Sequence, residues 1–341
     1  MTAAVLTEGY NAAISGDAVS ALIADRLGKV AAQAPTALKE AARAHLGAQS
    51  KKIRGRLAFA VLQEGGCDET LALDWATAVE VLHNASLVHD DLCDRDTHRR
   101  HQQTIHKRFG EAVAICLGDY LIATAYETCA LLKPSLVGRA SESIRTLASG
   151  QAGEFTNTGY PDWESYQAIA IQKTAPLLAL PITGGADILD IPISSTDAGH
   201  YFNNSALCFQ ILNDLGNFSG TDGANNPCSD LANGRPNAVL ACFKDLLSRE
   251  SQARFDLWTD RIRSGELIAD TVETRQWWHK VRQSYAFADT SQRLHFHFNE
   301  ASKSLFKLPP PIRAAIVPLQ QWLTKEVTRV QQQGGRCKIL T

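Results

Sequence analysis

Apolar side chains recur along this chain at the spacing of helix turns, and no convincing run alternates polar with apolar residues. Glycine and proline divide the pattern, and turn-forming residues are concentrated in one long loop, 216–236. The pattern predicts helices over 57–62, 111–132, 135–155, 163–180, 194–215, 237–249, 252–264, 268–305 (broken somewhere within) and 312–332. Without repeats or linkers, the sequence predicts an all-α fold, a large helical bundle in a single domain over 1–341.

Composition and charge limit the classes of protein to which this chain can belong. The net charge of −2 and the 45% hydrophobic content describe a soluble globular chain and do not indicate a polyanion-binding surface, so nucleic acid is not an expected partner. The first basic residue is Arg26, so the N-terminus lacks the charged start of a signal peptide. Eight scattered cysteines without a CxxC pair indicate reduced thiols. We therefore expect a cytoplasmic protein.

The segment 112–132 is the nearest approach to a membrane span. It carries Asp119 and Glu127, two charges that are costly inside a bilayer. The sequence therefore predicts a buried core helix here and no transmembrane segment.

The segment from Glu80 to Arg100 carries the clearest chemistry. An apolar helix ends in four aspartates and two arginines: Asp90, Asp91, Asp94, Asp96, Arg99 and Arg100. The first three aspartates are three or four apart and share a helix face, where each like-charge pair costs about 0.2–0.5 kcal/mol. Hard oxygen ligands followed by arginines suit Mg²⁺ that bridges to a phosphate group.

Two other metal sites compete with this interpretation. A di-iron bundle needs two Glu-x-x-His elements, and Glu80 with His83 supplies only one. A metal phosphohydrolase would use the doublet His89-Asp90, which arises often by chance. Binding of a diphosphate through Mg²⁺ explains more residues, because it also gives roles to the basic residues Lys51 and Arg54 and to a second site near 209–217.

An ordered set of motifs resembles the trans-isoprenyl diphosphate synthases (polyprenyl synthetases) over nearly the whole chain. The aspartates 90, 91 and 94 with the arginine pair fit the family's DDxxD and RR. The remaining matches follow in order: Ser50-Lys51-Lys52-Ile53-Arg54 for GKxxR, His106 with Phe109-Gly110, Gly118-Asp119, Gly150-Gln151 with Glu154, Lys173-Thr174, Phe209-Gln210, and Ser229-Asp230-Leu231 with Gly234-Arg235.

The resemblance implies an isoprenoid synthase-type bundle with a central active-site cavity, and three Mg²⁺ ions that clamp the diphosphate of an allylic substrate. Asp90, Asp94 and Asn213 would be metal ligands, with Asp91 a water-mediated partner. The implied catalytic residues are Asp90, Asp91, Asp94, Lys173 and Asp214. The implied substrate-binding residues are Arg99, Lys173, Thr174, Gln210, Asn213, Asn217, Asp230 and Arg235 for the allylic diphosphate region, and Lys51, Arg54, His83 and Arg100 for isopentenyl diphosphate.

Several positions depart from the family pattern, which makes this chain a divergent member. The second DDxxD is degenerate, because Asn213 and Asn217 replace two carboxylates and amides are poorer Mg²⁺ ligands. The family's lysine four residues before Asp230 is Asn226, and its glycine and proline after the arginine pair are His101 and Gln103. These departures put ordinary chain elongation in doubt while the first metal site stays intact.

Product length in the family depends on the residues four and five before the first aspartate. These are Ser86 and Ala85, both small, and the resemblance therefore implies room for a product of about twenty carbons or more. Small residues here also permit close helix packing.

We expect a Mg²⁺-dependent homodimeric prenyltransferase that couples an allylic prenyl diphosphate to isopentenyl diphosphate. The alternatives on the same fold are a class I terpene cyclase, an irregular coupling enzyme, a transferase to a non-isoprenoid acceptor, and a non-catalytic subunit. Asn213-Asp214-Leu215 opens like the cyclase triad, but Asn217 and Thr221 do not complete it. The isopentenyl-type site also argues against a pure cyclase.

Overall fold

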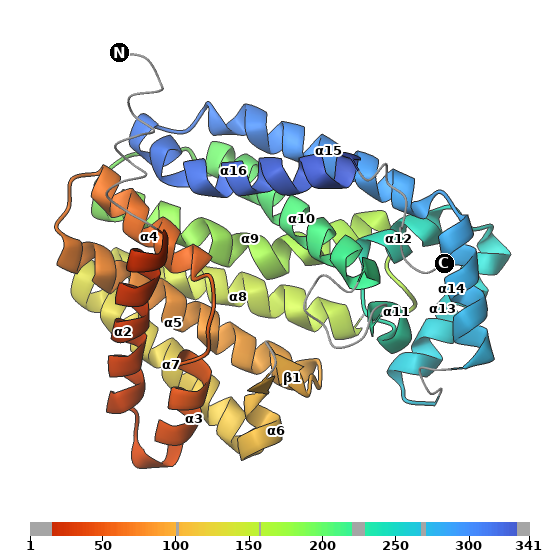
Figure 1. Ribbon diagram of the computed structural model, residues 1–341, viewed down its shortest axis with the longest axis horizontal. Helices are drawn as coiled ribbons and strands as arrows, with labels where there is room; N and C mark the ends of the chain where they lie inside the picture. Colours follow the sequence, from red (N-terminus) through yellow and green to blue (C-terminus); the bar gives the residue numbers. More distant parts are fainter. Residues whose placement is uncertain (1–15, 100–101, 157, 220–228, 267–270, 333–341) are drawn as a thin grey trace. The chain divides into compact units, whose positions relative to one another are not determined.

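The computed structural model describes residues 16–99, 102–156, 158–219, 229–266 and 271–332 (Figure 1). Its regular secondary structure consists of helices and one pair of two-residue strands, in keeping with the all-α prediction. The helices are α2 (Gly16–Gln33), α3 (Thr36–Leu46), α4 (Ile53–Glu64), α5 (Glu69–Cys93), α6 (Ile105–Phe109), α7 (Glu111–Leu132), α8 (Ser135–Thr156), α9 (Trp163–Ile188), α10 (Ser195–Ser219), α11 (Ser229–Asn233), α12 (Ala238–Asp245), α13 (Arg249–Arg263), α14 (Val272–Gln283), α15 (Ala286–Leu305) and α16 (Pro310–Gln332). The strands β1 (His98–Arg99) and β2 (Gln102–Gln103) pair antiparallel.

Contacts between α-carbons divide the chain into two compact units. Unit 1 comprises residues 1–143, 179–193 and 309–316, and unit 2 comprises 144–178, 194–308 and 317–341. The division falls inside α8, α9 and α16, so these helices contribute residues to both units. The expectation of a single domain over 1–341 stays a prediction.

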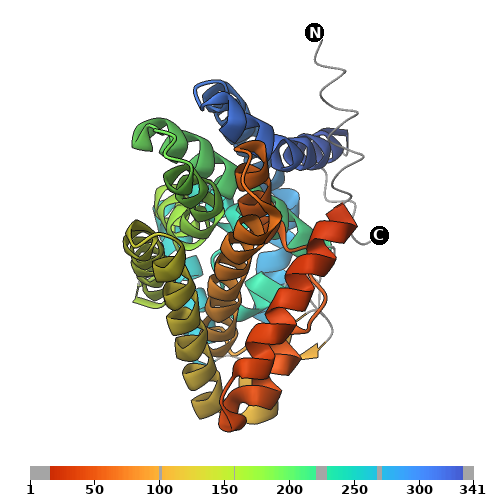
Figure 2. The same ribbon diagram turned by 90° about the vertical axis from the view of Figure 1, so that its left-hand side faces the viewer.

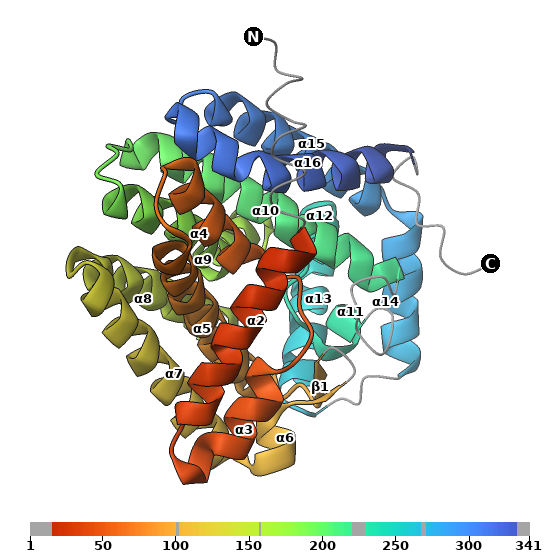
Figure 3. The ribbon, with the colours of Figure 1, turned by 60° about the vertical axis from the view of Figure 1, so that its left-hand side comes forward.

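Unit 1 is built around α5, which packs against α2, α4 and α7. Figures 2 and 3 show it lying between α2 and α7. Asp68 begins the helix by accepting a hydrogen bond from the Leu71 N–H at 2.9 Å. Trp75 is fully buried, and its indole N–H donates to the carbonyl oxygen of Pro181 at 2.9 Å. A side chain at Gly184 would collide with that ring, so glycine allows the close approach.

The prediction that a helix ends at Pro181 is wrong. The helix α9 continues through this residue to Ile188. Proline removes one backbone donor from a helix but keeps its carbonyl, and here that carbonyl accepts from Trp75. The predicted break within 268–305 is confirmed, because α14 ends at Gln283 and α15 begins at Ala286.

The helix predicted over 111–132 is confirmed as α7, but its predicted burial is wrong. Only one face is buried, through Ala114, Leu117, Gly118, Leu121, Ala125 and Cys129. Ile115 and Leu131 are 48% and 82% exposed. Among the described residues, α7 is the one helix whose length and apolar composition would let it cross a membrane, which is weak evidence for a span.

Unit 2 has an aromatic core. Its largest buried members are Tyr160, Phe218, Phe243, Phe255, Trp258 and Trp277. The rings contact one another closely; those of Phe255 and Trp277 meet edge to face with centroids 5.1 Å apart. Beside this cluster, α10 packs along α15 and thereby holds the second acidic region, Asn213–Asn217, in unit 2.

Candidate functional site

The first acidic region, Asp90–Asp96, lies where α5 ends in unit 1. Asp94 is the residue that caps the helix, and its N–H donates to the Asp90 carbonyl at 2.8 Å. The side chains of Asp90 and Asp94 are partly exposed, whereas Asp91 is 2% exposed. The three carboxylates therefore do not present one common acidic face, which corrects the interpretation drawn from their spacing alone.

Asp91 instead forms an ion pair within unit 1. The Nε–H of Arg99 donates to Asp91 Oδ1 at 2.6 Å. Burial raises the pKa of Asp91, and the adjacent Arg99 guanidinium opposes that shift. Asp91 is thus placed to fix the position of Arg99, the residue predicted to hold an allylic diphosphate.

His89 packs against α7 directly beside Asp90. Its Nε2 lies 3.4 Å from the Ile115 carbonyl and 3.7 Å from Asp119 Oδ1. A Cβ at Gly118 would come within 2.0 Å of the same nitrogen, so the ring occupies the space that glycine leaves. The Gly118-Asp119 pair therefore supports the helix end that carries Asp90.

The structure brings together Arg54 and His83, two of the residues predicted to bind isopentenyl diphosphate. Arg54 NH1 donates to His83 Nε2 at 3.1 Å. Sequence reasoning missed the contribution of Glu80, which is 2% exposed and accepts from the Gly55 N–H at 2.8 Å. This hydrogen bond ties the first turn of α4 to α5. Lys51 is exposed just before α4, and Arg100 lies outside the described residues.

Ala85 and Ser86, the predicted chain-length residues, both lie in the buried part of α5. Ala85 is fully buried and Ser86 is 6% exposed. The Ser86 hydroxyl donates to the His83 carbonyl at 2.8 Å, one turn back along the same helix.

The second acidic region lies near the end of α10 in unit 2. Asp214 is 3% exposed, and three donors converge on its carboxylate: the Tyr166 hydroxyl at 2.6 Å, the Gln210 amide at 3.0 Å and the Ala238 N–H at 2.7 Å. Burial, assisted by the charge of Asp230, raises the pKa of Asp214. Asp214 therefore joins α9, α10 and α12, while its neighbour Asn213 is exposed.

Asn217 is buried and links α10 to α11. Its Nδ2 donates to Ser229 Oγ at 2.7 Å, and its Oδ1 accepts from the Asp230 N–H at 3.2 Å. Asn237 holds the same turn by donating to Asp230 Oδ2 at 2.8 Å. The amide at position 217 therefore has a structural use, which the comparison of motifs alone could not reveal.

The remaining predicted residues of unit 2 surround these contacts. Lys173 forms an ion pair with Glu154, and Thr174 beside it is buried. Arg235 follows α11, where its N–H donates to the Asp230 carbonyl at 2.8 Å and its own carbonyl accepts from Tyr160. The backbone of Arg235 is thus tied to Asp230, whereas Lys173 is held by Glu154.

The described part of the chain contains oxygen donors suited to a divalent metal, although they do not form a compact ligand cluster. Within the described ranges, no group of three or more His, Cys, Asp or Glu side chains could hold a metal ion. Asp90 and Asp94 nevertheless offer two partly exposed carboxylates, and hard oxygen donors of this kind suit Mg²⁺ with its retained waters and substrate oxygens. The residues fit a metal that is bound jointly with a diphosphate.

Comparisons with known proteins agree on one family. A family model described as polyprenyl synthetase matches residues 35–265. The (2E,6E)-farnesyl diphosphate synthase of Mycobacterium tuberculosis (strain ATCC 25618 / H37Rv) is 37% identical over 172 residues, 48% of each chain. Geranylgeranyl pyrophosphate synthase 7, chloroplastic, of Arabidopsis thaliana is 37% identical over 202 residues, 54% of this chain and 58% of that protein. The alignments span about half the length of these curated relatives.

The fold agrees with a solved structure. The polyprenyl synthase from Caulobacter crescentus CB15, crystallised with calcium and isoprenyl diphosphate, matches with a TM-score of 0.75 and 25% identity over 92% of this chain and 94% of that one. An all-α bundle with acidic and basic residues at the family's positions defines an isoprenoid synthase fold. The chain belongs to the polyprenyl synthetase family.

Proposed function

We propose that the protein is a Mg²⁺-dependent prenyltransferase that ionises an allylic prenyl diphosphate and couples it to isopentenyl diphosphate. The observation that carries this proposal is the family match over residues 35–265, which includes both acidic regions and the basic residues that precede α4. The relatives named as farnesyl and geranylgeranyl diphosphate synthases support the same class of reaction.

Residues of unit 1 would hold the reacting groups at two places. Asp90 and Asp94 would hold Mg²⁺, and Arg99, fixed by Asp91, would donate charge-assisted hydrogen bonds to the allylic diphosphate. Bound Mg²⁺ would neutralise the diphosphate as a leaving group. Lys51, Arg54, His83 and Arg100 would bind isopentenyl diphosphate, and the contact between Arg54 and His83 supports their action as one site.

In unit 2, we assign direct contacts with substrate or metal to Asn213, Lys173, Thr174, Asp230 and Arg235. Asp214, Gln210 and Asn217 would act through them, because Asp214 and Asn217 are buried and all three engage protein groups. The contact between Arg54 and His83 supports an isopentenyl-type site, for which a terpene cyclase has no use. Coupling to isopentenyl diphosphate is therefore better supported than cyclisation.

The small residues Ala85 and Ser86 support a product of about twenty carbons. Both are buried in α5, five and four positions before Asp90, and neither fills much volume. We also propose a cytoplasmic homodimer whose interface includes the exposed apolar face of α7, on which Ile115 is 48% exposed.

Replacement of the first aspartates tests this function. Asp90→Asn and Asp94→Asn should each reduce isopentenyl-dependent turnover by at least 100-fold, because each removes a carboxylate from the metal. Asp96→Asn, in the same turn and without an assigned role, is the matched control and should keep turnover within about threefold of wild type. Full activity in either of the first two variants would refute the metal assignment.

A further inference from the structure

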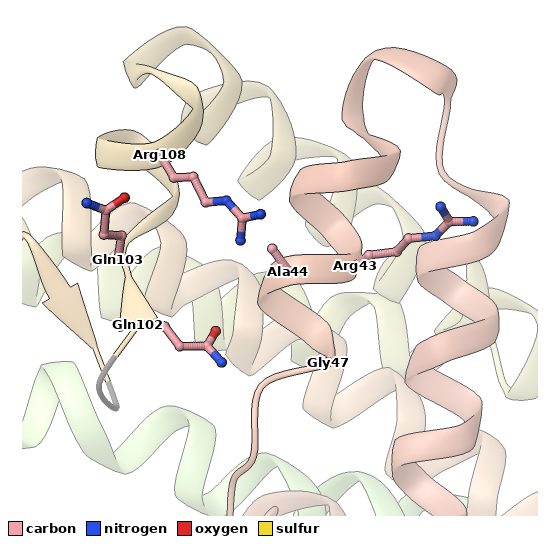
Figure 4. Close-up of a pocket in the computed structure, with 6 residues that line it drawn as sticks. All are labelled: Arg43, Ala44, Gly47, Gln102, Gln103 and Arg108. Carbon is pink, nitrogen blue, oxygen red and sulfur yellow. The ribbon is translucent and has the colours of Figure 1, made fainter.

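An open hollow in unit 1 is lined by none of the residues that were assigned a role above. It is formed by α3, β2 and α6, has a volume of about 500 Å³, and is lined by Arg43, Ala44, Gly47, Gln102, Gln103 and Arg108 (Figure 4). Its polar lining side chains are exposed, so a small ligand bound there would remain in contact with solvent on one side. We call it the α3–α6 hollow.

The side chains that line the α3–α6 hollow are suited to an anion. Figure 4 shows the Arg108 guanidinium and the Gln102 carboxamide directed toward Ala44, whose small side chain leaves the space open. Neither Asp nor Glu is among the six described residues that line it. Guanidinium and carboxamide groups together offer many N–H donors, which is the requirement of a phosphate group that has only acceptor oxygens.

The charge of the two lining arginines is only lightly compensated. Arg43 pairs with Glu40 at 2.8 Å, but both side chains are more than half exposed, so the pair is weak. Arg108 lies over the Phe109 ring, with its guanidinium carbon 4.9 Å from the centroid, a contact that orients the cation without neutralising it. Figure 4 shows the Arg43 guanidinium directed away from Arg108, so Arg108 is the cation that faces the hollow and makes its surface electropositive.

The α3–α6 hollow lies next to the strand pair that carries Arg99. Gln102 on β2 is the register partner of Arg99 on β1. A second, smaller cavity shares Ala44, Gln102, Gln103 and Arg108 with the hollow and reaches the Asp91–Arg99 ion pair. An anion held by Gln102 and Arg108 would thus stabilise the strand pair that carries Arg99.

We propose that the α3–α6 hollow is a second anion site, distinct from the substrate sites, for a small ligand that bears a phosphate or diphosphate group, and that its occupancy orders the β1–β2 pair. Gln103, which stands where the family has proline, also lines the hollow, but Figure 4 shows its carboxamide directed away from Arg108 and Ala44, so Arg108 and Gln102 are the donors that face the ligand. Binding itself is independent of the proposed function, whereas any influence on substrate through Arg99 rests on it.

The test is calorimetric titration of the metal-free full chain with inorganic diphosphate, together with hydrogen exchange of peptides that cover β2 and α6. Wild type should bind and show slower exchange in these peptides. Arg108→Gln should weaken binding about tenfold and abolish the protection, and Gln102→Ala should weaken binding severalfold. Lys107→Gln, an exposed neighbour outside the hollow, is the matched control and should change affinity less than twofold.

Further measurements distinguish binding at the α3–α6 hollow from binding at the substrate site, and a free phosphate from a lipid headgroup. A Lys51→Gln, Arg54→Gln double variant should retain the protection, and its loss there would assign the anion to the substrate site and overturn the proposal. Equal weakening of binding by Lys107→Gln and Arg108→Gln would indicate only diffuse electrostatic attraction and would also overturn the proposal.

The last measurement uses vesicles of phosphatidylcholine with and without phosphatidic acid. Arg108-dependent binding to the acidic vesicles alone would identify a lipid headgroup as the source of the phosphate, and absence of both kinds of binding would refute the site.

Discussion

At the scale of single residues, Asp91 and Asp90 of the first acidic region differ in how much they contribute to the stability of the fold. Asp91→Ala should lower the free energy of unfolding by about 1–3 kcal/mol, because it removes the partner of the Arg99 guanidinium from a buried position. Asp90→Ala should cost less than about 0.5 kcal/mol, since its side chain is partly exposed and its loss relieves like-charge repulsion. Urea denaturation measures both, and equal losses would contradict the distinction.

Ala85 provides a second residue-scale prediction. Ala85→Phe should shorten the prenyl product, because an aromatic ring would fill the space one turn before Asp90. Mass spectrometry of dephosphorylated products measures the chain length, with Ala78→Ser, a small change on the same buried helix, as the control for folding. An unaltered product length in a folded Ala85→Phe variant would contradict the chain-length assignment.

Single residues also show what the sequence could not predict. The family resemblance placed Arg54 and His83 in one expected site, and the two side chains are in hydrogen-bond contact in the structure. Helical spacing could not predict that the Asp91 carboxylate would pair with Arg99. Spacing determines which face of a helix a residue occupies, but not which side chains cover that face. Asn217 makes two hydrogen bonds to residues of α11, a short helix within a segment whose sequence predicts only a loop.

At the scale of elements, Gly118 leaves room for the His89 ring where α5 meets α7. Gly118→Ala should lower the free energy of unfolding by about 1 kcal/mol, the cost of displacing the His89 ring less the gain of alanine in a helix interior, because the new Cβ would come within 2.0 Å of the present position of His89 Nε2. In a His89→Ala background the same change should cost less than about 0.5 kcal/mol, since the obstructing ring is gone. Equal costs in the two backgrounds would show that His89 is not the cause.

His297 makes α15 sensitive to acid. The residue is 5% exposed, its Nδ1–H donates to Asn204 Oδ1 at 2.8 Å, and it stacks on Trp163. Burial, with the charge of Arg293 adding to it and Glu300 opposing it, lowers the pKa of His297 to about 4. The unfolded chain therefore binds a proton near pH 6.5 that the folded chain does not bind until about pH 4, so stability falls as the pH falls through this window.

This linkage has a measurable size. Between pH 7.5 and pH 5, the wild type should lose about 2 kcal/mol more of its free energy of unfolding than His297→Gln, which cannot titrate. Urea denaturation at the two pH values measures the difference. Parallel losses in the two proteins would contradict a neutral, buried His297.

The apolar patterns predicted where the helices lie better than they predicted which helix faces are buried. The bounds 111–132 of α7 followed from an apolar run between Gly110 and Pro134. Its exposed face could not be recognised, because an apolar helix has the same composition whether the chain or a partner covers it. The passage of α9 through Pro181 was missed because a proline inside a helix removes only one backbone hydrogen bond, which the sequence pattern alone does not distinguish from a helix end.

At the scale of the whole molecule, the exposed apolar face of α7 predicts self-association. Ile115→Arg should shift the protein from dimer to monomer in analytical ultracentrifugation, because it places a charge on a surface that would otherwise be covered. Leu257→Arg, on α13 and 63% exposed, is the matched control and should stay dimeric. A wild-type monomer, or a dimer that resists Ile115→Arg, would contradict this interface.

The central claim is that the chain joins two prenyl units, and incubation with defined substrates tests it most directly. Purified protein with Mg²⁺ would receive each allylic diphosphate from five to twenty carbons, with and without isopentenyl diphosphate, and dephosphorylated products would be identified by mass spectrometry. The account predicts longer linear prenyl alcohols only when isopentenyl diphosphate is present. Hydrocarbons or cyclic alcohols formed in its absence would contradict the account and identify a cyclase instead.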